Sequence, residues 1–254
     1  MKKKLQTFIF HKITNEPSHW IDIKTSQLVS FLNILKKNNT KITNLKDWRI
    51  GKSNAVALTF DDGFISHYET VMPLLSDKNL SAVFFIITNR IGKKGYMSWS
   101  HIKEMSNLGF EIGSHCVTHP RLDQINHDDV YEELIRSKHI IENQIQKSVI
   151  SFAHPAVNFT KYTNRLALVA GYKNICNSRP GFAYNQDSFI PRTSLTTNHT
   201  DNGFEKLLMM NKFREIKLIT NYELRSFVKG FFGENNYLKF RKFIQDNLSQ
   251  LIKD

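Results

Sequence analysis

Residues 56–63 read Val-Ala-Leu-Thr-Phe-Asp-Asp-Gly, an apolar run followed by two acids and a glycine. An apolar run of this length that closes on a glycine predicts a strand buried on both faces. Two carboxylates, Asp61 and Asp62, follow it directly. Adjacent side chains of an extended chain diverge, so one acid can face a metal and the other a water molecule. A helix N-cap followed by a solvated acid is the alternative for such a motif on its own.

Similar runs recur along the chain and alternate with helical patterns. The predicted strands cover residues 5–10, 55–60, 82–87, 110–113, 149–153, 174–177 and 189–195. Repeated strand-helix units indicate a mainly parallel sheet, either closed as a barrel or open and doubly wound. The continuous apolar character of several strands favours the barrel. In such folds, chemistry gathers where the strands end.

The helical patterns suggest how the chain is divided. Apolar residues recur at helical spacing over 99–108, before Gly109, and over 130–145, after an acidic start. Beyond residue 203 the pattern is helical only. We therefore expect a barrel over residues 1–202 and, over residues 203–254, a C-terminal helical segment packed on the barrel.

Length and composition exclude several classes of protein. The chain has 254 residues, of which 41% are hydrophobic and 12% aromatic, enough for a sizeable core. Disorder, collagen and coiled coil do not fit this composition. Two cysteines make no disulfide framework and favour a reducing compartment. The apolar run near the start is too short for a signal peptide, and no run is long enough to span a membrane. We expect a cytoplasmic protein.

The net charge of +12 is confined to the two ends of the chain. Residues 1–54 carry +8 and residues 203–254 carry +4, whereas residues 55–202 hold 14 basic and 14 acidic residues. No zinc-finger or RNA-binding motif accompanies this basicity, so no nucleic-acid partner is expected. A solvated basic face is one interpretation, and peripheral contact with an anionic membrane or glycolipid is the other. The oligomeric state is left open.

A second polar motif follows the fourth predicted strand. Residues 111–120 read Glu-Ile-Gly-Ser-His-Cys-Val-Thr-His-Pro, which places His115 and His119 four residues apart. This spacing puts both imidazoles on one face of a helical turn, where they can share one metal ion. Alone, such a pair is more often surface or core histidine. Because both motifs lie at strand ends of one sheet, an Asp and two His can converge and leave an open side for water.

These motifs resemble those of a known family, the NodB-type polysaccharide deacetylases of carbohydrate esterase family four. Residues 59–63 match the family's first motif, Thr-Phe-Asp-Asp-Gly. Residues 114–119 match its second, His-(Ser/Thr)-x-x-His, except that Cys116 stands where Ser or Thr is usual. Trp99 and residues 73–75 and 109–113 are also similar to the family. The resemblance covers about residues 5–195.

The resemblance implies a distorted barrel of about seven β/α units, with extra C-terminal helices in this chain. It also implies hydrolysis of an N-acetyl or O-acetyl group on an amino sugar of a polysaccharide, lipid-linked saccharide or glycoside. Carried over by position, Asp62, His115 and His119 hold a divalent metal, zinc in the first place and cobalt or nickel otherwise. Asp61 is then the general base. The chemistry is consistent, because a divalent ion acidifies water while a free carboxylate accepts its proton.

The family's third motif is not matched. Residues 151–157 read Ser-Phe-Ala-His-Pro-Ala-Val and contain neither its Arg nor its Tyr. His154 is a candidate for substrate contact or structure, with direct catalysis as the weaker alternative. Arg192, at the end of the seventh predicted strand, can replace the missing Arg by pairing with Asp61 and holding it ionised. An ordinary surface ion pair is the alternative for Arg192.

The proton donor is the least defined part of the prediction. Residues 195–199, Leu-Thr-Thr-Asn-His, fit the family's Leu-x-x-x-His motif, which implies His199 as the acid. His11, just after the first strand, resembles a Tyr-His element of some relatives and is our choice as active-site wall or proton donor. If neither serves, the alternative function is a catalytically impaired relative that keeps its metal and binds a glycan or a partner protein.

Three other residues are expected to pack without taking part in chemistry. Cys116 is interpreted as buried beneath its loop, because a reactive thiolate needs an exposed electropositive setting. His67 is expected on the helix after the first motif, as a packing or solvated residue. Trp48 is interpreted as core, although aromatic faces also stack on sugars.

Overall fold

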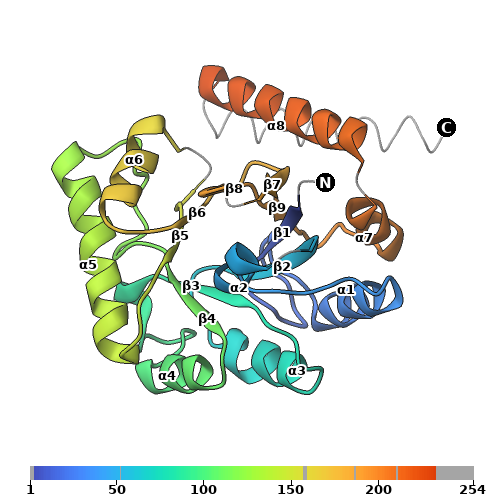
Figure 1. The fold of residues 1–254 in the computed structure, drawn as a ribbon, viewed down its shortest axis with the longest axis horizontal. Helices are drawn as coiled ribbons and strands as arrows, with labels where there is room; N and C mark the ends of the chain where they lie inside the picture. The colour runs from blue at the N-terminus through green and yellow to red at the C-terminus, as the bar shows by residue number, and fades with distance from the viewer. Residues whose placement is uncertain (1–2, 52, 157–158, 186, 210, 233–254) are drawn as a thin grey trace. The chain divides into compact units, whose positions relative to one another are not determined.

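A computed structural model describes residues 3–51, 53–156, 159–185, 187–209 and 211–232. The chain divides into two compact units between residues 209 and 210. The first unit is a nearly closed sheet surrounded by helices (Figure 1). Its strands are β1 (Lys4–Phe10), β2 (Ala55–Phe60), β3 (Val83–Ile86), β4 (Glu111–Ser114), β5 (Ser151–Ala153), β6 (Asn174–Cys176), β7 (Phe182–Tyr184), β8 (Phe189–Ile190) and β9 (Thr193–Ser194).

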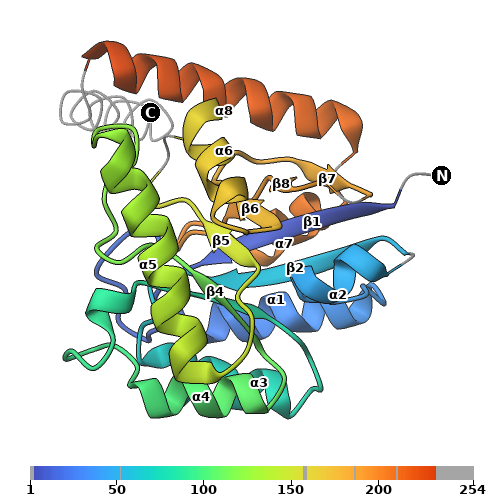
Figure 2. The ribbon, with the colours of Figure 1, turned by 60° about the vertical axis from the view of Figure 1, so that its left-hand side comes forward.

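The strands follow one another around the sheet in the order β7-β1-β2-β3-β4-β5-β6-β8, and β9 pairs with β1. All of these pairs are parallel except that of β1 with β7. Figure 2 shows β1 and β2 side by side through the middle of the first unit. The structure therefore confirms the predicted barrel of parallel strands, to which β7 adds a short antiparallel strand that the sequence analysis missed.

The seventh predicted strand, residues 189–195, differs from the prediction because it is split in two. Its first part, β8, pairs with β6, and its second part, β9, pairs with β1. Pro191 and Arg192 lie between them, and a proline cannot donate to a strand ladder. This short segment thus links the last parallel strand to the first, and Arg192 stands where the barrel closes.

The helices of the first unit surround the barrel, except that α2 contributes Leu45 and Trp48 to the interior core (Figure 1). They are α1 (Thr25–Lys37), α2 (Leu45–Ile50), α3 (Met72–Ser76), α4 (Trp99–Asn107), α5 (His127–Ile145), α6 (Lys161–Val169) and α7 (Asp201–Leu208), with a π-helix η1 (His67–Val71) and a 3-10 helix η2 (Thr88–Arg90). The predicted patterns over 99–108 and 130–145 correspond to α4 and α5. Among the described residues, no helix combines the length and apolar character needed to cross a bilayer.

Side chains alternate between two cores along each strand. On β2, Leu58 and Phe60 face outward into the core beneath the helices, whereas Ala57 faces the barrel interior. Leu45 and Trp48 of α2 belong to the interior core, which confirms the packing role expected for Trp48. The interior core also includes small residues, Ala55, Ala153, Cys176 and Ala183.

Gly113 lies on β4, and its lack of a side chain is required. A Cβ atom at this position would lie 2.5 Å from the ring of Phe85 and 3.0 Å from the carbonyl oxygen of Ser151. The glycine therefore lets the Phe85 ring occupy the barrel interior, where it fills the space beneath the site.

The C-terminal part of the chain is described only as far as residue 232. Helix α7 belongs to the first unit and packs on α1, with the rings of Phe31 and Phe204 5.0 Å apart. Helix α8 (Lys212–Phe232) lies in the second unit. The predicted helical pattern beyond residue 203 extends past the described residues, so the packing of residues 203–254 on the barrel stays a prediction.

Candidate metal centre

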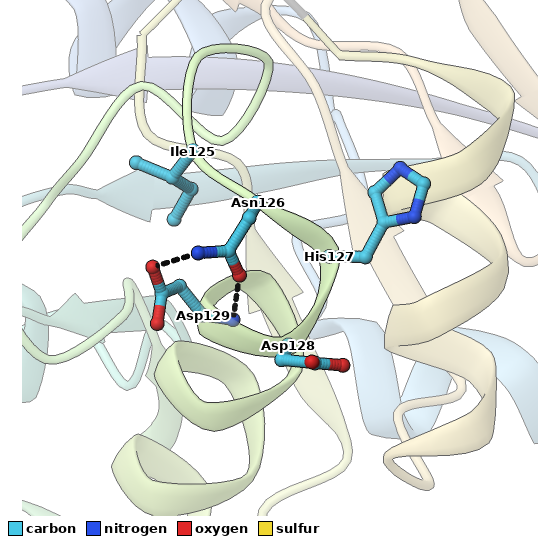
Figure 3. A pocket seen from close by; sticks show the side chains of 5 residues that line it. All are labelled: Ile125, Asn126, His127, Asp128 and Asp129. Atoms are coloured by element: carbon cyan, nitrogen blue, oxygen red, sulfur yellow. Dashed lines mark hydrogen bonds between the residues drawn. The ribbon is translucent and has the colours of Figure 1, made fainter.

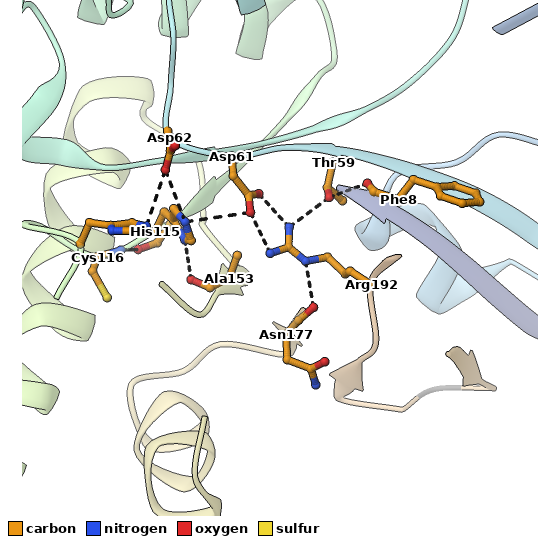
Figure 4. A network of polar contacts seen from close by, with 11 residues as sticks. Phe8, Thr59, Asp61, Asp62, His115, Cys116, Ala153, Asn177 and Arg192 are labelled. Carbon is orange, nitrogen blue, oxygen red and sulfur yellow. Dashed lines mark hydrogen bonds and ion pairs between the residues drawn. The ribbon is translucent and has the colours of Figure 1, made fainter. Parts of the chain in front are cut away.

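Two loops at the carboxyl ends of β2 and β4 bring the predicted metal ligands together (Figure 4). The Asp62 Oδ1 atom lies 3.7 Å from the Nε2 atoms of both His115 and His119. One ligand atom from each of the three residues falls within 4.8 Å of the others. All three side chains therefore converge on one point, as predicted from the two motifs.

Backbone conformation makes this convergence possible. Asp62, Cys116 and His119 have φ angles of 78°, 67° and 65°, a left-handed region that non-glycine residues rarely adopt. Such strained residues persist where the surrounding structure holds them, often at functional sites. The expected helical turn between the two histidines is wrong: residues 115–119 form an irregular loop, and its left-handed residues bring the imidazoles together.

Asp61 and Asp62 point to different neighbours, as expected for adjacent side chains (Figure 4). Asp61 continues the inward alternation of β2, because its backbone N–H still bonds to Phe10 of β1 at 2.9 Å. The left-handed turn at Asp62 then ends the strand and directs the second carboxylate toward the histidines.

His115 is held in one tautomer. Its Nδ1 atom lies 2.7 Å from the carbonyl oxygen of Ala153, and a carbonyl can only accept a hydrogen bond. Nδ1 therefore carries the proton, and the lone pair of Nε2 faces Asp62 and His119. Burial lowers the pKa of His115 to about 3, so the imidazole is neutral. A neutral imidazole whose second nitrogen is hydrogen-bonded is the usual form of a metal ligand.

Glu133 of α5 holds the loop between the two histidines. Its Oε2 atom accepts hydrogen bonds from the backbone N–H groups of Val117 at 2.7 Å and Thr118 at 3.0 Å. Its Oε1 atom accepts from the Thr118 hydroxyl at 2.8 Å. Glu133 was not predicted from the sequence. The available signal was its position three residues after Val130 and next to Leu134, at the edge of the buried stripe of an amphipathic helix.

Asp61 is bound by Arg192 through two parallel hydrogen bonds. The Nη1–Oδ1 distance is 2.7 Å and the Nη2–Oδ2 distance is 2.9 Å, and both side chains are buried. Arg192 also donates to the Thr59 hydroxyl and to the Asn177 carbonyl, at 3.0 and 3.2 Å. Burial alone would raise the pKa of Asp61, but the charge of Arg192 overrides it and the pKa falls to about 2. Arg192 is thus a buried partner of Asp61 and not a surface ion pair.

Asp62 has no such partner. Its pKa is raised to about 7, first by burial and then by the negative charge of Asp61. The Oδ1 atom is buried and has no hydrogen-bond partner within the described part of the chain. A buried carboxylate oxygen left in this state, facing two imidazole nitrogens, fits a cation. Zinc ligands are about 2.0–2.2 Å from the metal, so neighbouring ligand atoms are about 3.3 Å apart, close to the spacing seen here.

The candidate acids lie in different places. His11 follows β1 and interacts electrostatically with Asp61, Arg192 and His119, and its buried Nδ1 atom has no hydrogen-bond partner among the described residues. Burial lowers its pKa to about 4. His199 stands before α7, where its ring stacks on Phe204 and its Nδ1 lies 3.0 Å from the Thr196 hydroxyl. Of the two, only His11 has described interactions with the residues around the triad.

The other residues singled out in the sequence are buried. Cys116 and His67 are fully buried, as expected for packing residues. His154, after β5, donates from Nε2 to the Asn164 amide oxygen at 2.8 Å. Burial lowers its pKa to about 4. A separate pocket at the start of α5 is lined by residues 125–129, where Asn126 caps the helix by accepting from the Asp129 N–H (Figure 3).

Comparison with known proteins identifies the family. Residues 49–175 match the family model described as polysaccharide deacetylase, and the chain therefore belongs to the polysaccharide deacetylase family. YxkH of Bacillus subtilis is 28% identical over 128 residues, which are 50% of this chain and 46% of that protein. A peptidoglycan-N-acetylglucosamine deacetylase of Bacillus cereus is 30% identical over 101 residues, 39% of this chain and 35% of that one. The chain thus spans less than half of the length of these two relatives.

A third relative and two solved structures extend the comparison. The poly-beta-1,6-N-acetyl-D-glucosamine N-deacetylase of Staphylococcus aureus is 24% identical over 171 residues, 59% of each chain. The deacetylase PplD of Streptococcus pyogenes superposes with a TM-score of 0.76 at 20% identity, over 83% of this chain and 100% of that one. The polysaccharide deacetylase BC0361 of Bacillus cereus gives 0.73 at 23% identity, over 82% and 69%. At these identities the structures establish the fold, which confirms the barrel expected from the resemblance.

Proposed function

We propose that this protein is a metal-dependent carbohydrate deacetylase that removes an N-acetyl or O-acetyl group from an amino sugar. The observation that carries the proposal is the placement of Asp62 Oδ1 3.7 Å from two imidazole nitrogens, with the carboxylate of Asp61 alongside and 4.0 Å from His115 Nε2. A divalent ion held by Asp62, His115 and His119 would lower the pKa of water and polarise the acetyl carbonyl. Zinc suits this donor set, with cobalt or nickel as alternatives.

Asp61 is the proposed general base. Its low pKa keeps it ionised at neutral pH, so it can accept a proton, and Arg192 fixes both of its oxygens in place. A carboxylate of such low pKa is a weak base toward ordinary water, so it needs water whose acidity is already raised. Arg192 is therefore proposed to orient the base.

His11 is proposed to complete the site as its wall or as the donor of a proton to the leaving amine. It is neutral at neutral pH because burial lowers its pKa to about 4, while the charge of Asp61 acts in the opposite direction. Proton donation by His11 thus requires it first to gain a proton during the reaction.

The relatives suggest the substrate class. Two of them are named for acting on N-acetylglucosamine, one in peptidoglycan and one in a β-1,6-linked polymer. We therefore place N-acetylglucosamine oligomers first among candidate substrates. Lipid-linked saccharides and glycosides follow.

A second candidate function is a metal-retaining protein that binds a glycan or a partner without turnover. It is favoured by the segment after β5, where His154, Pro155 and Ala156 stand in place of the family's third motif. Acetate release from N-acetylglucosamine oligomers, with zinc, cobalt or nickel added, separates the two functions. Turnover that is abolished by Asp61→Asn and unaffected by His139→Gln, an exposed change on α5, supports the deacetylase. Glycan binding without acetate release by any metal form supports the second candidate.

A further inference from the structure

We propose that Arg90 forms an anion subsite beside the metal triad and binds a carboxylate group of a ligand. The inference rests on the proposed deacetylase function for the identity of that ligand. It rests on the structure alone for the position and chemistry of the guanidinium group. The carboxylate has two sources in this reaction class: the acetate that is released, and an acidic substituent of the glycan.

The segment that carries Arg90 is anchored to both loops of the triad. On one side, the N–H groups of Thr88 and Asn89 donate to the carbonyl oxygens of Cys116 and Val117, at 3.2 and 3.0 Å. On the other side, the Met97 N–H donates to the Gly63 carbonyl at 3.0 Å. Residues 88–97 therefore stand between the loop of Asp62 and the loop of the two histidines.

The side chain of Arg90 is held in place by an aromatic pair. Its Nη1 donates to the Tyr96 hydroxyl at 2.9 Å, and its Cζ lies 5.5 Å from the centre of the Tyr96 ring. That ring in turn stacks on Phe64, with centroids 5.2 Å apart and an interplanar angle of 19°. An arginine whose position is fixed before binding loses less entropy when it takes a ligand.

The guanidinium keeps most of its hydrogen-bonding capacity. A guanidinium has five N–H donors, and the described contact to Tyr96 uses one of them. Within the part of the chain that the structure describes, no carboxylate forms an ion pair with Arg90. Arg192 differs from Arg90 in this respect, because its N–H groups donate to Asp61 and to the residues around it.

Arg90 lies beside the loop of the two histidines, because the N–H of the preceding residue, Asn89, bonds to the Val117 carbonyl of that loop. The His119 side chain is 28% exposed, so this side of the triad opens to solvent. A planar, half-buried cation at the open side matches a carboxylate, which accepts two parallel N–H bonds from arginine.

The test measures binding, so it does not depend on turnover. The full chain loaded with zinc is titrated with three probes: sodium acetate, a neutral glucose disaccharide, and the same disaccharide carrying a carboxylate. We expect Arg90→Gln to weaken at least one carboxylate probe about 10-fold and to leave the neutral disaccharide unchanged. Arg90→Lys should recover part of the loss, and Tyr96→Phe should lose part of the binding.

Lys94→Gln is the matched control, because it removes one positive charge from an exposed position on the same segment. Loss of acetate binding alone assigns the subsite to the released product, and loss of the acidic disaccharide assigns it to a glycan substituent. Equal binding of all probes to Arg90→Gln and wild type overturns the proposal, as does an equal effect of Lys94→Gln. If the protein releases no acetate from any substrate but Arg90→Gln still loses carboxylate binding, the proposed function fails and the subsite stands.

Discussion

Arg192 and Asp61 form a buried two-bond ion pair across the barrel interior, with N–O distances of 2.7 and 2.9 Å. The arginine comes from the segment that closes the barrel, and the aspartate from the end of β2. The guanidinium carbon also lies 5.1 Å from the centre of the Phe85 ring. Closure of the barrel and orientation of the proposed base therefore depend on the same pair.

Replacing Arg192 with Met should lower the free energy of unfolding by about 3–5 kcal/mol, because Asp61 is then buried without a partner. The double variant Asp61→Asn/Arg192→Met should recover part of this loss, since no buried charge remains. Urea unfolding of the wild type, both single variants and the double variant measures the coupling. Additive effects in this cycle would mean that the pair does not interact in the folded protein.

Loss of metal affinity should distinguish a proposed metal ligand from the adjacent acid Asp61. His115→Ala removes one of three proposed ligands and should lose zinc, whereas Asp61→Asn should keep it nearly intact, because both Asp61 oxygens accept from Arg192 and the nearer one is 4.0 Å from His115 Nε2. Titration calorimetry and metal content after dialysis give both values. Stoichiometric zinc retained by His115→Ala would remove that residue from the metal site. Equal zinc loss by Asp61→Asn would contradict its separate role.

Glu133→Ala should weaken zinc binding by about 10–100-fold, because it frees the loop that carries both histidines. Glu133→Gln keeps an oxygen for the two backbone N–H groups and should remain close to wild type. Glu132→Ala, an exposed neighbour on α5, controls for the loss of a carboxylate from the helix. Calorimetric titration with zinc measures all three, and wild-type affinity in Glu133→Ala would show that the loop holds its conformation without this contact.

Gly113→Ala should destabilise the barrel by about 1–3 kcal/mol, because the added Cβ would meet the Phe85 ring at 2.5 Å. The second change Phe85→Leu should relieve the overlap and recover part of the stability. Thermal unfolding of the single and double variants tests this. No recovery in the double variant would place the strain at the Ser151 carbonyl, which the same Cβ would approach at 3.0 Å.

The free energy of unfolding should fall as the pH is lowered below neutral, partly because of His67. Burial lowers the pKa of His67 from 6.5 to about 4, and its Nε2 donates to the His11 carbonyl at 3.0 Å. Folding thus favours the neutral form, so its contribution is complete above pH 6.5 and is lost as the pH falls toward about 4. One such group lowers the free energy of unfolding by about 2 kcal/mol between about pH 7.5 and about pH 5.

The variant His67→Gln keeps a donor near the same carbonyl but does not titrate, so it should flatten this pH dependence by that amount. His139→Gln, at an exposed position, controls for the substitution. Urea unfolding at the two pH values gives the difference directly. An unchanged difference in His67→Gln would show that His67 does not take up a proton on unfolding in this range.

Much of the fold could be predicted from local pattern. The buried strand before Asp61, the sequence of strands and helices, and the family motifs around Asp62 and His115 all depend on residues close together in the chain. The split of the last predicted strand at Pro191 and the antiparallel β7 were not predictable in this way. Strand pairs this short are fixed by the neighbours that complete the barrel and not by their own residues.

The residue types and their positions at strand ends already indicate the candidate donor set, an Asp, two His and a second acid. The partner that each side chain meets depends on the folded barrel. The Ala153 carbonyl that sets the His115 tautomer and the ion pair of Arg192 with Asp61 join segments far apart in the chain. These contacts depend on the close packing of the folded barrel, which overrides local conformational preference and brings together charges that are distant in the sequence.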